Sequence, residues 1–113
     1  MAEVHNVIGD VEGRTALIVD DIVDTGGTLA KVAEAIKAKG AREVLASSSH
    51  AVLSGDAIQR MARSPLSKLI VTDSIPLAPE KRIDKIVVLS IAELLAKAIR
   101  NIHEETSVTS LFV

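Results

Sequence analysis

Three acidic residues and a short glycine-rich segment stand together early in the chain. Asp20 and Asp21 are adjacent, Asp24 follows shortly after, and the run continues as Thr25-Gly26-Gly27-Thr28. Carboxylates accept hydrogen bonds from vicinal hydroxyls, directly or through a divalent ion. Glycine lets the backbone bend tightly and bring several N–H groups to one anion, and the threonine hydroxyls add further donors. A sugar phosphate, with an anion at one end and hydroxyls at the other, is the simplest ligand for this arrangement.

Each of these pieces also has an ordinary structural explanation. An aspartate pair after a strand can serve as turn residues, and two glycines can form a flexible connector. The functional interpretation rests on the combination, because acids, glycines and threonines must all occur in this order.

The segments on either side predict the elements that position these residues. Residues 16–19 form an apolar run too short for a helix, whereas apolar residues recur at helical spacing over 28–39. We therefore expect a buried strand, an acidic edge, a loop and a helix. Ligands of open α/β sheets bind beyond the carboxyl ends of the strands, where the two adjacent aspartates stand. The N-terminus of the following helix favours negative charge.

The remaining apolar runs predict more strands of the same sheet. Residues 43–50, 69–73 and 86–89 each form such a run, and residues 4–8 predict a short strand at an antiparallel edge. Strands that alternate with helices through right-handed crossovers give a single α/β domain over 1–113. We expect a doubly wound, mostly parallel sheet with helices on both faces.

Helix-capping residues mark the ends of the later helices. Ser54 or Asp56 can cap a short helix that ends at Arg63. Ser90 and Glu93 form a capping box before the best-marked helix, whose apolar residues share one face. These residues are Ile91, Leu94, Leu95, Ala98, Ile99 and Ile102.

Composition excludes several classes of protein. The 113 residues are 48% hydrophobic but include one Phe and no Trp or Tyr, so the core must consist of aliphatic side chains, as in a buried parallel sheet. Without aromatic stacking platforms, a net charge of −2 and no basic block predict no nucleic-acid partner and no anionic membrane. Cysteine is absent, and no apolar run is long enough to span a membrane. We expect a cytoplasmic protein.

The segment from Ala16 to Thr28 resembles the phosphoribosyl-diphosphate (PRPP) binding motif of type I phosphoribosyltransferases and ribose-phosphate pyrophosphokinases. In that motif a strand ends in two acids, and an Asp-Thr-Gly-Gly-Thr loop follows. The resemblance implies that Asp20 and Asp21 face the ribose 2- and 3-hydroxyls. It also implies that Asp24, Thr25, Gly26, Gly27 and Thr28 cradle the 5-phosphate.

The flanking sequence is similar to the C-terminal domain of ribose-phosphate pyrophosphokinase (PRPP synthetase) over nearly the whole chain. The similar segments include 6–14, Ser49-His50, 72–76, 95–100 and 107–112. A base-specific phosphoribosyltransferase shares only the central motif. The resemblance implies a phosphoribosyltransferase-like fold and a part in the transfer of diphosphate from Mg-ATP to ribose 5-phosphate.

The same resemblance indicates what this chain does not supply. The family's ATP-binding elements and its flexible loop with catalytic Lys and Arg lie upstream of the matching region. No Lys or Arg falls inside the motif, so we expect the chain to bind ribose 5-phosphate or PRPP without turnover. Mg²⁺ is expected with ATP in the full enzyme, and no metal ligand is assigned here. The expected protein partners are the missing N-terminal domain or further copies in a homo-oligomer.

Other functions remain open at this stage. Asp73 after a later strand, with Pro76 following, is also typical of a phospho-accepting receiver domain, although no lysine closes the last strand at Leu89. A half-domain kept only for assembly is the second alternative, since exposed apolar surface would drive self-association.

Three further features have two interpretations each. Asp73 and His50, both at strand ends, can line the cleft, but strand-end capping is the favoured role. The tail 107–112 matches a segment that borders a regulatory site in many family members, or it simply packs the C-terminus onto the sheet.

Overall fold

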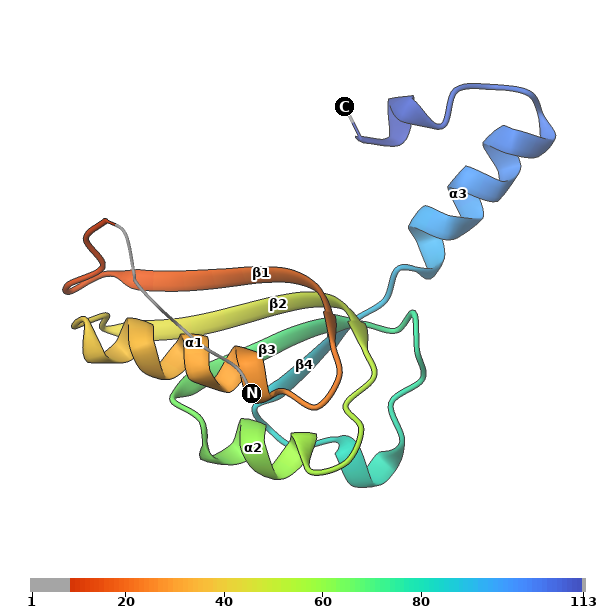
Figure 1. Cartoon of the computed structure of the whole chain (residues 1–113). Coiled ribbons are helices and arrows are strands. Elements are labelled where there is room, and N and C mark those ends of the chain that lie inside the picture. Colours follow the sequence, from red (N-terminus) through yellow and green to blue (C-terminus); the bar gives the residue numbers. More distant parts are fainter. Residues whose placement is uncertain (1–8, 113) are drawn as a thin grey trace.

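The computed structural model describes residues 9–112. Strands and helices alternate along this part of the chain, as Figure 1 shows. The strands are β1 (Thr15–Val23), β2 (Glu43–Ala51), β3 (Leu66–Thr72) and β4 (Ile86–Leu89). The helices are α1 (Gly27–Ala38), α2 (Ala57–Arg63) and α3 (Ala92–His103), with 3-10 turns η1 (Pro79–Lys81) and η2 (Thr109–Phe112).

The four strands form one sheet in the order β1-β2-β3-β4, and every neighbouring pair is parallel. The predicted α/β class and parallel sheet are therefore confirmed. The expected strand at 4–8, with its antiparallel edge, lies outside the described residues. Because all four strands run in the same direction, their carboxyl ends meet at one edge, where β1 leads into α1.

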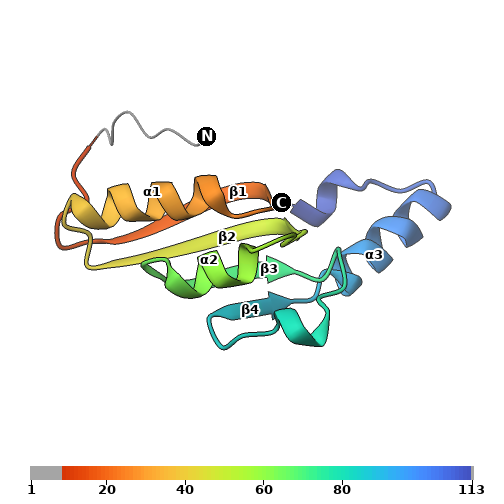
Figure 2. The ribbon, with the colours of Figure 1, turned by 60° about the horizontal axis from the view of Figure 1, so that its bottom comes forward.

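Both crossover helices lie on the same face of the sheet. Figures 1 and 2 show α1 and α2 side by side on this face from two directions. The expected double winding, with helices on both faces, is wrong for the described residues. Each right-handed crossover steps in the same direction along the order β1-β2-β3-β4, so each connecting helix falls on the same side. A second covered face would require the strand order to reverse.

The core lies between this covered face and the two helices. Alternate residues of the central strands point into it and are almost wholly buried: Val44 and Ala46 of β2, and Leu69 and Val71 of β3. Ala33 of α1 and Met61 of α2 close the core from the other side. The core thus consists of aliphatic side chains and methionine, as the composition predicts.

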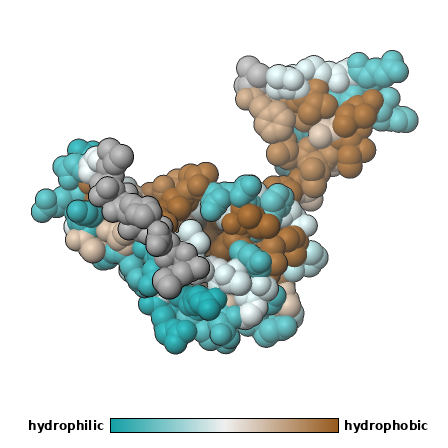
Figure 3. All heavy atoms as spheres, viewed as in Figure 1, coloured by the Kyte–Doolittle hydropathy of each residue, from teal (hydrophilic) through white to brown (hydrophobic). Residues whose placement is uncertain are grey.

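Helix α3 does not cover the sheet. It leaves the carboxyl edge after β4 and extends away from the strands (Figure 1), and none of its residues is buried. Its predicted apolar stripe is therefore largely exposed, and Figure 3 shows hydrophobic residues gathered on it. The tail packs against α3, through η2, rather than onto the sheet. No described helix has the length and hydropathy needed to cross a membrane.

Most predicted boundaries agree with the structure, but the predicted caps do not. The helix expected to be capped by Ser54 or Asp56 begins at Ala57 without a side-chain cap. Helix α3 also lacks a side-chain cap, so the Ser90–Glu93 capping box is not formed. Instead, the Ser90 hydroxyl accepts a bond from the Ala92 N–H at 3.2 Å.

Candidate functional site

The predicted site lies where β1 leads into α1. We term residues 24–28 the glycine loop. This loop, with Asp20, Ile22, Val23 and Leu29, lines a cavity of about 270 Å³ that opens at the carboxyl edge of the sheet. The structure thus brings one acidic residue of β1 and the whole glycine loop to a common space.

The two adjacent aspartates do not take equivalent positions. Asp20 lines the cavity, whereas Asp21 is absent from its wall. Successive side chains of a strand point to opposite faces, which separates the two carboxylates. The Asp21 N–H donates to Asp20 Oδ1 at 2.8 Å, which orients the Asp20 carboxylate. Of the pair expected to face ribose, Asp20 is the residue that shares a cavity with the loop.

Helix α1 begins with backbone donors that have no acceptor in the described structure. The first helical hydrogen bond runs from the Ala30 N–H to the Gly26 carbonyl at 2.9 Å. The N–H groups of Gly27, Thr28 and Leu29 find no protein acceptor among residues 9–112, and Gly26 provides no side-chain cap. Unpaired N–H groups and the positive end of a helix dipole together favour an anion at this place.

Glycine occurs at positions 26 and 27 of the loop for different physical reasons. Gly26 has φ of 79°, and an added Cβ would lie 2.7 Å from Met61 Cε, so the fold itself requires glycine there. At Gly27 the backbone is not left-handed, and an added Cβ would meet nothing within 4 Å. Since the protein places no constraint on Gly27, its missing side chain leaves space beside the free amides of the cavity.

Two residues far along the chain form hydrogen bonds to the glycine loop. Ser54 clamps Asp24, since Ser54 Oγ donates to Asp24 Oδ1 and the Ser54 N–H donates to the Asp24 carbonyl at 3.0 Å. Arg60 of α2 donates from Nη1 to the Thr25 carbonyl at 3.0 Å. Sequence reasoning missed both contacts, because nothing in the local pattern relates residues that are 30 and 35 positions apart.

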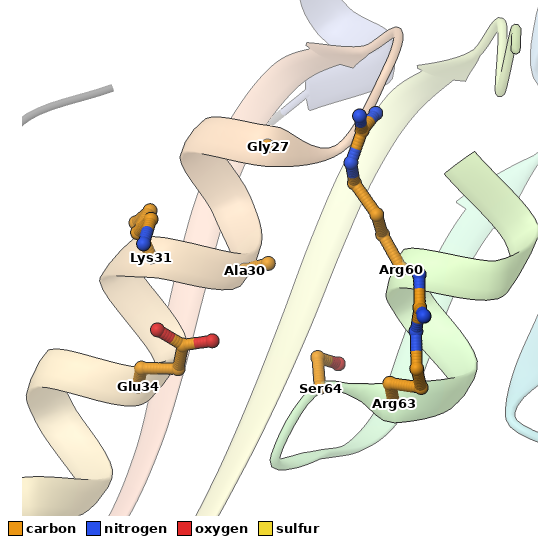
Figure 4. A pocket seen from close by; sticks show the side chains of 7 residues that line it. All are labelled: Gly27, Ala30, Lys31, Glu34, Arg60, Arg63 and Ser64. Carbon is orange, nitrogen blue, oxygen red and sulfur yellow. The ribbon is translucent and has the colours of Figure 1, made fainter. Parts of the chain in front are cut away.

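Arg60 also lines a second cavity, a groove of about 250 Å³ between α1 and α2. Figure 4 shows its side chain extending from α2 toward the start of α1. The groove is otherwise lined by Gly27, Ala30, Lys31, Glu34, Arg63 and Ser64. Gly27 lines both cavities, so the groove and the loop cavity meet at the first residue of α1.

Asp73 fastens α3 to the end of β3. Its Oδ1 accepts a hydrogen bond from the Ile91 N–H at 2.9 Å. This backbone bond, and then the Ser90 hydroxyl, hold the pKa of the Asp73 carboxyl below its ordinary value, against a small opposing effect of desolvation. The strand-end capping role is therefore confirmed for Asp73. His50 similarly contacts Ser74, with Nδ1 and Oγ 2.8 Å apart.

The described residues contain no group of three His, Cys, Asp or Glu side chains placed to hold a metal ion. Asp20 and Asp24 are the carboxylates that line the loop cavity. Mg²⁺ commonly binds through one or two carboxylates and completes its coordination with substrate phosphates and water. The residues present fit only such a partial, substrate-dependent site.

Comparisons with known proteins identify relatives of this chain. Residues 3–113 match the family model described as the phosphoribosyl synthetase-associated domain. A ribose-phosphate pyrophosphokinase from Caldanaerobacter subterraneus is 54% identical over 112 residues, which are 99% of this chain and 35% of that protein. One from Pasteurella multocida is 49% identical over 113 residues, or 99% of this chain and 36% of that protein.

A solved structure extends the comparison to three dimensions. The crystal structure of phosphoribosylpyrophosphate synthetase from Mycobacterium smegmatis aligns with a TM-score of 0.84 at 42% identity, covering 87% of this chain and 33% of that one. The chain spans about a third of the length of the relatives it matches. The family match leaves no support for a receiver domain, and the chain belongs to the phosphoribosyl synthetase-associated domain family.

Proposed function

We propose that this chain is the ribose 5-phosphate or PRPP binding part of a ribose-phosphate pyrophosphokinase, corresponding to its C-terminal half. The glycine loop takes the 5-phosphate, and Asp20, which lines the same cavity, takes the ribose hydroxyls; the expected contact of Asp21 with them stays a prediction. The observation that carries the proposal is the row of unpaired N–H groups at Gly27, Thr28 and Leu29 beside an open cavity. The family names of the relatives supply the substrate class.

Charge and shape both support a phosphorylated sugar rather than a neutral one. The amides and the dipole of α1 attract an anion, and the threonine hydroxyls of the loop add donors. Asp20 is on the same cavity wall and would repel a second phosphate, but its oxygens accept bonds from hydroxyls. One end of the cavity therefore favours an anion and the other favours hydroxyl groups.

We further propose that the chain by itself does not transfer diphosphate from ATP. Phosphoryl transfer depends on positive charge placed around the reacting phosphates. No Lys or Arg lines the loop cavity within the described part of the chain. In a complete enzyme, Mg²⁺ arriving with ATP and residues outside this chain would supply that charge, while this chain positions the pentose.

The binding proposal is tested by calorimetric titration of the purified chain with ribose 5-phosphate. We expect saturable heat for the native chain, none for ribose without phosphate, and at least about tenfold weaker binding for Gly27→Val, since the added side chain fills the cavity beside the amides. Ala38→Val, which also introduces valine but at an exposed position at the other end of α1, is the control. No saturable heat with the native chain would refute the proposal.

The catalytic part is tested separately by incubation with Mg-ATP and ribose 5-phosphate. We expect no AMP above that of a blank without protein. AMP formation that disappears in Gly27→Val would show that this chain carries a complete active site, and would overturn the proposed division of labour.

An assembly partner is also part of the proposal. The open face of the sheet, opposite α1 and α2, exposes Leu17, Val19 and Leu89, and α3 exposes Leu95, Ile99 and Ile102. Exposed apolar surface on each of these elements is typical of an interface. Either the remainder of a family enzyme or a second copy of this chain would cover it. A scaffold without ligand binding would keep this association but show no heat with ribose 5-phosphate.

A further inference from the structure

Helix α2 and the residues before it support the glycine loop on the side away from the cavity. Arg60 bonds the Thr25 carbonyl, Met61 packs where a Cβ on Gly26 would lie, and Ser54 clamps Asp24. Met61 is fully buried, so this support is anchored in the core. Arg60 is the member of the set that touches the loop with a charged group.

The bond from Arg60 determines how one peptide unit of the loop is oriented. In a trans peptide the C=O and the following N–H point in opposite directions. The structure contains no cis peptide among its described residues. With the Thr25 carbonyl turned toward Arg60, the Gly26 N–H must point away from α2. No protein acceptor occupies this N–H within residues 9–112.

The linings of the two cavities show from which side Arg60 acts on the loop. Arg60 lines the groove between α1 and α2 but not the loop cavity, whereas Thr25 and Gly26 line the loop cavity but not the groove. The guanidinium therefore acts from outside the proposed phosphate site. A charge-assisted bond to the carbonyl is stronger than a neutral one, so it restricts rotation of this peptide unit and lowers the entropy cost of ordering it around a ligand.

We propose that Arg60 is a positioning residue that presets the glycine loop by holding the Thr25 carbonyl, so that the Gly26 amide joins those of Gly27 and Thr28 in binding a phosphate monoester. This role rests on the proposed function. It also supplies a cationic group that acts on the loop from outside the sequence motif, through its backbone rather than through the substrate.

Arg63 is a matched control. It lies one turn further along α2, lines the same groove, and makes no hydrogen bond to the loop within the described structure. Arg60→Ala and Arg63→Ala remove the same charge from the same groove. A difference between them therefore reports the contact with Thr25 rather than the electrostatic potential of the surface.

The first readout is the affinity for ribose 5-phosphate, measured by calorimetry. We expect Arg60→Ala to bind about tenfold more weakly, Arg60→Lys to bind with intermediate affinity, and Arg63→Ala to stay within about twofold of the native chain. Thermal midpoints measured alongside should be unchanged for all three, since Arg60 is not part of the core. Equal affinities for Arg60→Ala and Arg63→Ala would overturn the proposal and leave the phosphate site standing.

The second readout needs no ligand. Backbone ¹⁵N order parameters of Gly26 and Gly27 should fall from about 0.85 toward 0.6 in Arg60→Ala and remain high in Arg63→Ala. If the native chain fails to bind ribose 5-phosphate, the proposed function is refuted while these values still decide whether Arg60 orders the loop. Unchanged order parameters in Arg60→Ala would overturn the positioning role whatever the ligand.

Discussion

The two faces of the sheet are built from similar aliphatic residues but serve different purposes. On the face covered by α1 and α2, Leu69 and Val71 are buried, and α2 supports the glycine loop at the carboxyl edge. On the open face, Leu17 is 56% exposed and Val19 is 74% exposed. One face is therefore a packed core beside the candidate site, and the other leaves aliphatic side chains exposed to solvent.

The proposed binding site and the proposed assembly surface use different residues of this chain. The glycine loop gets its supporting contacts from α2 and the loop before it, within the covered layer. The open face and α3 contribute no residue to the lining of the loop cavity. A change on the open face should therefore alter association without altering the site, and the predictions below test this separation.

The largest difference is expected between two leucines on opposite faces. Leu69→Ala should lower the free energy of unfolding by about 3 kcal/mol, because it leaves a cavity in a fully packed core. Leu17→Ala should lower it by less than about 1 kcal/mol, because that side chain remains largely in solvent. Urea denaturation of both variants at low protein concentration measures the two values. Similar losses would mean that the open face is already covered in solution.

The next largest difference is expected between the two glycines of the loop. Gly26→Ala should destabilise the fold by about 2 kcal/mol, because alanine is strained at this positive φ and its Cβ presses on Met61. Gly27→Ala should leave stability unchanged or raise it by about 0.5 kcal/mol, because alanine favours the first turn of a helix. Thermal unfolding of the pair checks the signs. Equal destabilisation by the two substitutions would mean that the fold, rather than a ligand, requires glycine at position 27.

A smaller effect is expected on self-association. Ile99 is 67% exposed on the apolar stripe of α3, and Ile99→Lys should weaken the proposed association by about tenfold, because aliphatic area that the interface would bury is lost. Ala96→Lys adds the same charge to the polar side of the helix and is the control. Sedimentation velocity over a concentration series measures both. Identical behaviour of the two variants would remove α3 from the interface.

The smallest effect concerns the attachment of α3 and depends on pH. Because the pKa of Asp73 is lowered in the folded chain, its contribution to stability is complete above the unfolded value of about 3.9 and is lost as pH falls through the folded value. In Asp73→Asn the free energy of unfolding should therefore fall less steeply as the pH is lowered below about 4. Asp84→Asn, which removes a carboxylate from another loop, is the control for urea midpoints measured between pH 3 and 6.

If this fall in the free energy of unfolding is the same in Asp73→Asn and in the native chain, the Ile91 N–H bond does not hold α3. Hydrogen exchange of the Ile91 amide gives an independent reading. It should accelerate in Asp73→Asn, and the amides of β2 should be unaffected.

Much of the local structure was predictable from the sequence. The run before Asp20, the change to helical spacing after the glycines and the later apolar runs place the four described strands and the helices close to their observed positions. These features depend on side-chain periodicity, which a short window of sequence contains. Because parallel strands align their carboxyl ends, the position of the acids and glycines at one edge also followed from the sequence.

The sequence by itself therefore determined which elements form and which end of the sheet carries the chemistry. Only the tertiary structure decided that Asp20 rather than Asp21 lines the cavity, that Arg60 reaches the Thr25 carbonyl, and that one face of the sheet stays open. The physical reason is the distance along the sequence over which each effect acts. Periodicity acts between neighbours along the chain, whereas these outcomes depend on the direction in which successive crossovers wind and on contacts between residues 30 or more positions apart.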